Sequence, residues 1–154
     1  MDRFARLAAL IAAAIFATAC ASLSRPALAE TAPVIGQHPQ QSVEEGGYSY
    51  QLFVPRTFDP EARWPLMVFL HGSGERGADI AKVKVHGPPK HADLDPDFPF
   101  ILVSPLLPAE EDWDIAKLEA ILDHIVETMP IDRERIYLTG LSRGGHATWR
   151  WGAQ

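Results

Sequence analysis

A serine framed by glycines lies near the end of the sequence. Gly140, Ser142 and Gly144 form the pattern Gly-x-Ser-x-Gly. The pattern is typical of a nucleophilic serine on a sharp turn between a strand and a helix, since small neighbours let the turn close. It predicts attack of the Ser142 hydroxyl on an acyl carbonyl, giving an acyl-enzyme. The alternative is an ordinary turn with a surface serine.

A second group, His71-Gly72-Ser73-Gly74, follows another apolar segment. Acyl transfer requires backbone amides that stabilise the oxyanion, and glycines let the backbone approach the substrate oxygen. We expect the Arg143 amide to be one donor and the Ser73 or Gly72 amide to be the other. His71 precedes the serine, so we interpret it, with Gly74, as shaping the loop and not as the general base.

The elements that must position these residues can be read from the apolar pattern. Aromatic and β-branched residues predict a strand at 48–54. Continuous apolar segments predict buried strands at 66–70, 100–103 and 136–139. Residues 115–129 repeat apolar side chains at helical spacing, with Asp112 or Asp114 as the cap and Pro130 as the stop. Another helix should follow Ser142. Strands that alternate with helices predict an α/β fold with a mostly parallel sheet.

The segment between the second and third expected strands has a weak pattern. Residues 80–85 could form a short helical turn. Gly87-Pro88-Pro89 and Pro96 are expected to break anything longer. Asp93, Asp95 and Asp97 alternate on this segment, but the glycine and distal glutamate of a calcium loop are missing. We therefore interpret this segment as a solvated loop. We expect no metal and no cofactor.

Composition narrows the choice of partners. A chain of 154 residues is expected to form one domain. Its net charge is −6 and it has no basic cluster, which argues against nucleic acid or an anionic membrane as the main partner. Cys20 is the single cysteine, so no internal disulfide can form.

The N-terminus has the pattern of an export signal. Arg3 and Arg6 precede an apolar segment at 7–19, and Ala27-Leu28-Ala29 is a suitable cleavage site. We expect a signal peptide at 1–29, a lead-in segment at 30–45 and the folded domain at 46–154. The protein would then be periplasmic or secreted. In an alternative interpretation, Cys20 is lipidated and anchors the protein to a membrane.

The two motifs, taken together, resemble those of secreted bacterial α/β-hydrolases. The resemblance includes His71-Gly72-Ser73-Gly74-Glu75-Arg76-Gly77, the Gly140–Gly145 motif and the segment 131–139, and it covers about residues 45–151. The similar proteins are polyhydroxybutyrate-depolymerase-like esterases, dienelactone hydrolases and predicted peptidases of the prolyl-oligopeptidase type. The resemblance implies an α/β-hydrolase fold, Ser142 as nucleophile and hydrolysis of an ester or peptide without a metal.

The sequence departs from this family in length and at Arg143. The acid and histidine that should follow the serine are absent, so we expect a domain truncated after the nucleophile elbow. The cation at Arg143 could favour acidic substrates, or it could pair with Asp112 or Glu75. Three functions stay open: a carboxylic ester hydrolase, a peptidase of the prolyl-oligopeptidase type, and a non-catalytic fragment. The sequence that follows Gln154 would discriminate a serine hydrolase, which needs a further Asp and His, from a non-catalytic fragment, whereas the choice between ester and peptide stays open.

Overall fold

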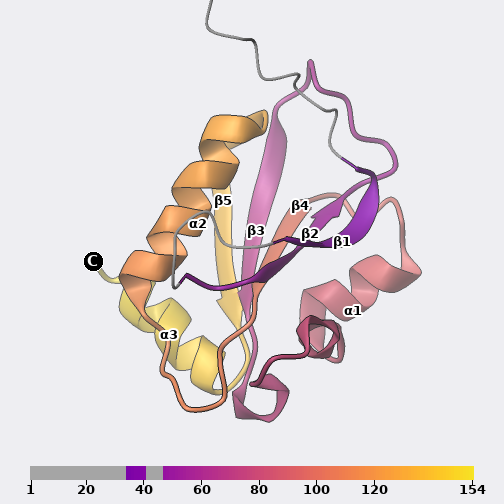
Figure 1. Cartoon of the computed structure of the whole chain (residues 1–154). Helices are drawn as coiled ribbons and strands as arrows, with labels where there is room; N and C mark the ends of the chain where they lie inside the picture. The colour runs from indigo at the N-terminus through magenta and orange to yellow at the C-terminus, as the bar shows by residue number, and fades with distance from the viewer. Residues whose placement is uncertain (1–33, 41–46) are drawn as a thin grey trace, which may run out of the picture. The chain divides into compact units, whose positions relative to one another are not determined.

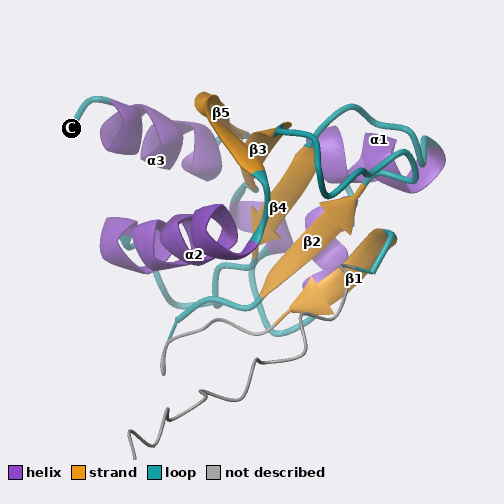
Figure 2. Ribbon diagram, turned by 90° about the horizontal axis from the view of Figure 1, so that it is seen from above, coloured by secondary structure: helices purple, strands orange, loops and turns teal. Residues whose placement is uncertain are grey.

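The computed structural model describes residues 34–40 and 47–154. The expected signal peptide at 1–29 and Cys20 lie outside the described residues. Within the described part, the chain forms a mixed sheet with helices on both of its faces (Figures 1 and 2). None of the helices there has the length and apolar character needed to cross a membrane.

In the described part of the chain, five strands form one sheet in the order β1-β2-β4-β3-β5. They are β1 (Gly36–Gln40), β2 (Tyr50–Val54), β3 (Trp64–Leu70), β4 (Ile101–Pro105) and β5 (Ile131–Gly140). β2 pairs antiparallel with β1 and β4, whereas β3 pairs parallel with β4 and β5. Four strands therefore share one direction and β2 runs against them, which confirms the predicted α/β fold with a mostly parallel sheet.

Helices cover both faces of this sheet, and the core is divided accordingly. In Figure 2, α2 (Ile115–Thr128) and α3 (Arg143–Gly152) lie on one face and α1 (Gly87–Leu94) on the other. Val68 belongs to the cluster that packs on α2 and α3, while its neighbour Phe69 packs with Ala92 of α1. Successive side chains of a strand point to opposite faces, so a strand buried on both sides must be apolar throughout.

The two long helices follow the sequence prediction closely. Asp114 caps α2, because its carboxylate accepts a hydrogen bond from the Ala116 amide at 2.9 Å. Helix α3 buries Ala147 and Trp151 on its inner side, as the sequence predicts. β3 and β4 also lie where apolar segments predict them, and β5 begins five residues earlier than the predicted 136–139.

Two local expectations need correction. Strand β1 lies inside the segment 30–45, for which no strand was expected. Pro39 is compatible with it because β1 is an edge strand, where a missing N–H is tolerated. The expectation that Gly87-Pro88-Pro89 allows nothing longer than the short turn at 80–85 was also wrong. These prolines begin α1, since the first helical amides need no intrahelical partner. The short turn expected at 80–85 is a 3-10 helix, η2 (Ile80–Lys84).

Candidate active site

The sheet brings its chemically interesting residues to one edge. β3, β4 and β5 run parallel, so the loops that follow their carboxyl ends meet at the same edge of the sheet. His71 follows β3 and Ser142 follows β5. Asp112 and Trp113 lie in the loop after β4. In open α/β sheets, this edge is where ligands bind.

Ser142 occupies a strained backbone conformation. Its φ is 53° and its ψ is −114°, and it is the one non-glycine residue with positive φ among the residues that the structure describes. These angles are close to those of the first central residue of a type II′ turn, a position that glycine normally takes. The strain positions an exposed serine between the end of β5 and the first residue of α3.

The glycines around Ser142 are required by close packing. A Cβ at Gly144 would lie 1.9 Å from the Leu70 carbonyl oxygen, and one at Gly140 would lie 2.5 Å from the Gly144 carbonyl group. Real side chains do not approach backbone this closely, so both positions exclude any larger residue. Gly145 is less restricted, since its nearest contact would be the Gly140 oxygen at 3.3 Å.

The loop after β3 lies directly against this turn. The Leu141 amide donates to the Leu70 carbonyl at 2.9 Å, which joins the ends of β5 and β3. A Cβ built on Gly72 would lie 3.5 Å from the Ser142 Cβ. The structure therefore brings the His71–Gly74 loop and the Gly-x-Ser-x-Gly motif together, although some 70 residues separate them in the sequence.

His71 is a buried residue that holds two loops together. Its Nε2 accepts a hydrogen bond from the Leu107 amide at 3.0 Å, so the proton is on Nδ1, which donates to the Gly72 carbonyl at 2.7 Å. Burial lowers the pKa of His71, a shift that the Gly72 carbonyl and the Glu75 carboxylate partly oppose. Both ring nitrogens are occupied, so this geometry favours a positioning role for His71.

The candidate oxyanion amides differ in their availability. The Gly72 amide already donates to the Glu75 carboxylate at 3.0 Å, and Glu75 is buried. Ser73 is the first residue of the 3-10 helix η1 (Ser73–Glu75), and Arg143 is the first residue of α3. The first amides of a helix have no intrahelical acceptor, so the Ser73 and Arg143 amides are the better placed candidates.

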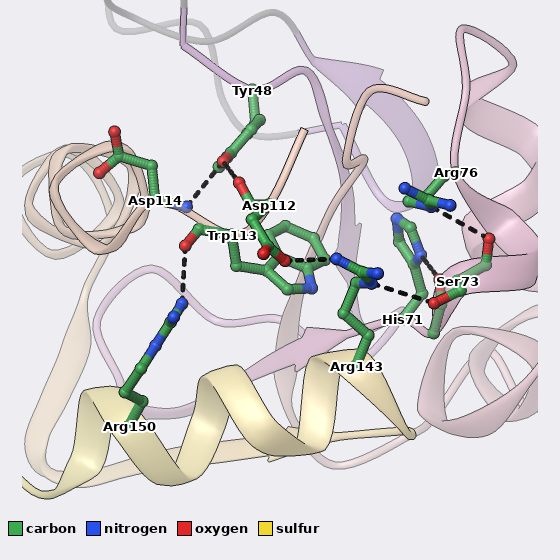
Figure 3. A network of polar contacts seen from close by, with 10 residues as sticks. Tyr48, His71, Ser73, Arg76, Asp112, Trp113, Asp114, Arg143 and Arg150 are labelled. Atoms are coloured by element: carbon green, nitrogen blue, oxygen red, sulfur yellow. Dashed lines mark hydrogen bonds and ion pairs between the residues drawn. The ribbon is translucent and has the colours of Figure 1, made fainter. Parts of the chain in front are cut away.

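A polar network connects the three loops at this edge (Figure 3). Arg143 donates from Nε to the Ser73 hydroxyl at 3.0 Å and from Nη1 to the Asp112 carboxylate. The Tyr48 hydroxyl donates to the Asp112 carbonyl at 3.0 Å and accepts from the Asp114 amide at 2.8 Å. The indole ring of Trp113 packs edge-on against Tyr48 and His71. The network fixes the loop after β4 against the start of α3.

An open cavity of about 340 Å³ lies beside this network. It is lined by Ser73, Asp112, Trp113, Ser142, Arg143, His146, Ala147 and Arg150. Its size is at the lower end of the range for small-molecule sites. A larger hollow of about 470 Å³ lies between β5 and α3, but its lining offers threonine hydroxyls and no titratable side chain. The smaller cavity is therefore the candidate active site.

The sequence predicted part of this site and missed the rest. Trp113 and Arg150 were not proposed as parts of it, because nothing in their local pattern marks them. Glu75 was named as another possible partner of Arg143, but its carboxylate accepts a hydrogen bond from the Gly72 amide instead. Asp112 was named as a helix cap and as one possible partner of Arg143, and the structure shows the ion pair. Among the described residues, no group of three histidines, cysteines or carboxylates is placed to hold a metal ion.

The arrangement of strands, helices and turns defines the α/β-hydrolase type of fold. The structure is similar to solved esterases. It matches a thermostable esterase at 30% sequence identity with a TM-score of 0.55, over 73% of this chain and 36% of that protein. No protein-family model and no curated protein matches the sequence.

Two further solved structures support the same fold at lower identity. Esterase 2 of Thermogutta terrifontis, phosphorylated by paraoxon, is 14% identical with a TM-score of 0.53, over 73% of this chain and 46% of that protein. The CE1 ferulic acid esterase of the anaerobic fungus Anaeromyces mucronatus is 16% identical with a TM-score of 0.52, over 75% of this chain and 52% of that protein. The chain thus spans 36 to 52% of the lengths of these three esterases.

Proposed function

We propose that this chain is the N-terminal part of an exported serine hydrolase that cleaves carboxylic esters, with Ser142 as its nucleophile. One observation carries the proposal: the positive φ of Ser142 places an exposed serine at the end of β5, beside the loop after β3. The solved esterases with this fold support it. The strained turn fits a nucleophile elbow, which keeps the hydroxyl clear of the sheet.

The chemistry follows from the positions of these groups. The Ser142 oxygen attacks the ester carbonyl carbon and passes its proton to a general base. The Arg143 and Ser73 amides stabilise the oxyanion that forms. The C–O bond of the ester then breaks, and the alcohol leaves with the proton from the base. Water attacks the acyl-enzyme in the same way and releases the carboxylic acid, so the enzyme is regenerated.

The general base is a separate part of the proposal. His71 has both ring nitrogens engaged. His146 lines the same cavity one helical turn after Ser142, so its side chain starts on the flank of α3. We propose instead that the base and its acid follow residue 154 in the full-length protein, in the order that the resemblance to α/β-hydrolases implies. A chain that lacks them would be the non-catalytic alternative.

A fluorophosphonate probe tests the nucleophile, because it forms a stable bond with an activated serine. We expect the full-length gene product to be labelled at Ser142, and the label to be absent in Ser142→Ala. Ser104→Ala is the matched control, since this serine of β4 is buried and the probe cannot reach it. Labelling that persists in Ser142→Ala would contradict the proposal.

The substrate class and the location need their own tests. Hydrolysis of p-nitrophenyl butyrate without hydrolysis of a matched p-nitroanilide would favour an esterase, and the reverse would favour a peptidase of the prolyl-oligopeptidase type. We also propose export through the signal peptide at 1–29. N-terminal sequencing should then find Glu30 first, whereas a lipid on Cys20 would support the anchored alternative.

A further inference from the structure

One side of α3 carries a stripe of basic side chains that faces the candidate active site. Arg143, His146 and Arg150 follow one another at spacings of three and four, which places them on the same side of the helix. All three line the cavity that contains Ser142. Figure 3 shows the two arginines reaching from α3 toward the loop that holds Asp112 and Trp113. The stripe therefore forms one wall of the cavity.

The charges on this wall are only partly balanced. Among the described residues that line the cavity, Asp112 is the one carboxylate, and it pairs with Arg143. Arg150 donates from Nη2 to the Trp113 carbonyl at 2.8 Å, and it has no carboxylate within ion-pair distance among the described residues. Arg150 is exposed, and its bond to a neutral carbonyl supplies no opposing charge. The remaining guanidinium N–H groups can still donate to a ligand.

A further donor lies just beneath the cavity surface. The indole N–H of Trp113 is buried and has no acceptor among the residues that the structure describes. One donor of the cavity lining is thus left without an acceptor. An arginine fork matches the two oxygens of a carboxylate, and such charge-assisted hydrogen bonds are stronger than neutral ones.

We propose that the cavity binds a carboxylate carried by the substrate, with Arg150 as the residue that recognises it. The inference rests on the proposed function, because Ser142 would attack the ester group of the same molecule. Ser142 immediately precedes α3 and Arg150 lies eight positions later on it, or about 12 Å along the helix axis. The preferred substrate would then be a monoester of a dicarboxylic acid, long enough to span from Ser142 toward Arg150.

A matched pair of substrates tests this specificity. The probes are p-nitrophenyl hydrogen adipate, which carries a free carboxylate, and its methyl ester, which is neutral. We expect kcat/KM of the full-length protein to favour the carboxylate, and Arg150→Gln to lower the ratio of the two values about tenfold. Arg150→Lys should retain part of the preference for the carboxylate-bearing substrate, because it keeps the positive charge. The control is Arg133→Gln, which removes an exposed cation outside the cavity lining and should leave the ratio unchanged.

Binding measured without turnover separates this inference from the proposed function. Adipate should bind to the Ser142→Ala protein in calorimetry, and adding Arg150→Gln should weaken the binding about tenfold. If the protein hydrolyses the neutral ester, and Arg150→Gln changes neither the ratio of the two kcat/KM values nor the binding of adipate, the inference alone would be overturned. Failure to hydrolyse either ester would overturn the proposed function, and adipate binding would still decide whether the anion site exists.

Discussion

The Arg143 Nε donates a hydrogen bond to the Ser73 hydroxyl at 3.0 Å, although 70 positions separate the two residues. This bond connects the residue after the candidate nucleophile to the residue whose amide is the candidate oxyanion donor. Asp112 accepts from the same guanidinium and so adds the loop after β4. The cation at position 143, which departs from the pattern of similar hydrolases, therefore links three loops of the candidate site.

Removing Asp112 should affect activity more than stability. The ion pair is partly exposed, and such pairs contribute at most about 1 kcal/mol. We expect Asp112→Asn to change the free energy of unfolding by less than that amount in urea. Ester hydrolysis should fall about tenfold because Arg143 is no longer held. Asp123→Asn on the exposed side of α2 is the control, and equal losses of activity in both variants would contradict the prediction.

Gly144 and Gly145 should respond very differently to an added methyl group. Gly144→Ala would place Cβ 1.9 Å from the Leu70 oxygen, whereas Gly145→Ala would place it 3.3 Å from the Gly140 oxygen. We expect Gly144→Ala to cost about 3 kcal/mol or more, because β3 and α3 must move apart. Gly145→Ala should cost less than about 1 kcal/mol. Thermal unfolding measures both, and similar melting temperatures would show that the turn is packed differently.

The strain at Ser142 predicts an unusual order of stabilities. Glycine adopts positive φ without a steric penalty, while alanine does not. Ser142→Gly should therefore be more stable than Ser142→Ala by about 1 kcal/mol, although glycine is normally the less stable of the two in ordered structure. Both variants should lose hydrolysis. Denaturation in urea measures the difference, and a more stable alanine variant would exclude the positive φ.

The buried His71 should make stability depend on pH. Burial lowers its pKa below the ordinary value of 6.5, so the unfolded chain takes up a proton at a higher pH than the folded one. The free energy of unfolding should therefore fall as the pH decreases below about 6.5 toward the folded pKa. His71→Gln cannot be protonated and should lose less stability between pH 7.5 and 5. His91→Gln, at an exposed position, should behave like the wild type.

Tyr48 should stabilise the loop through its hydroxyl. Tyr48→Phe removes the donor to the Asp112 carbonyl and the acceptor of the Asp114 amide, both partly buried. We expect a loss of about 1–2 kcal/mol in the free energy of unfolding. Tyr137→Phe is the control because this side chain is 47% exposed. A loss of the same size in both variants would mean that the hydroxyl of Tyr48 is not responsible.

The sequence was most informative where the structure of a segment depends on residues that are near one another in the chain. Val68 and Phe69 lie in a run without alternation, so burial on both faces of a sheet could be predicted. The Asp114 cap and the helix that follows it also depend on local spacing. The helix that begins at Gly87 was missed, because the same prolines that interrupt a helix can also begin one. Strand β1 was missed because its own residues have little strand preference. Its extended conformation depends on the antiparallel pairing with β2.

The chemical types at the candidate site can be read from the amino-acid sequence alone: a serine between glycines, and a glycine-rich loop after a buried strand. Which of these groups are free to act depends on the folded structure. Gly72 has its amide bound to Glu75, and His71 has both ring nitrogens occupied. Only the tertiary structure placed Arg150 in the cavity of Ser142. The physical reason is that hydrogen bonding and charge depend on distances in space, which the order of residues along the chain does not specify.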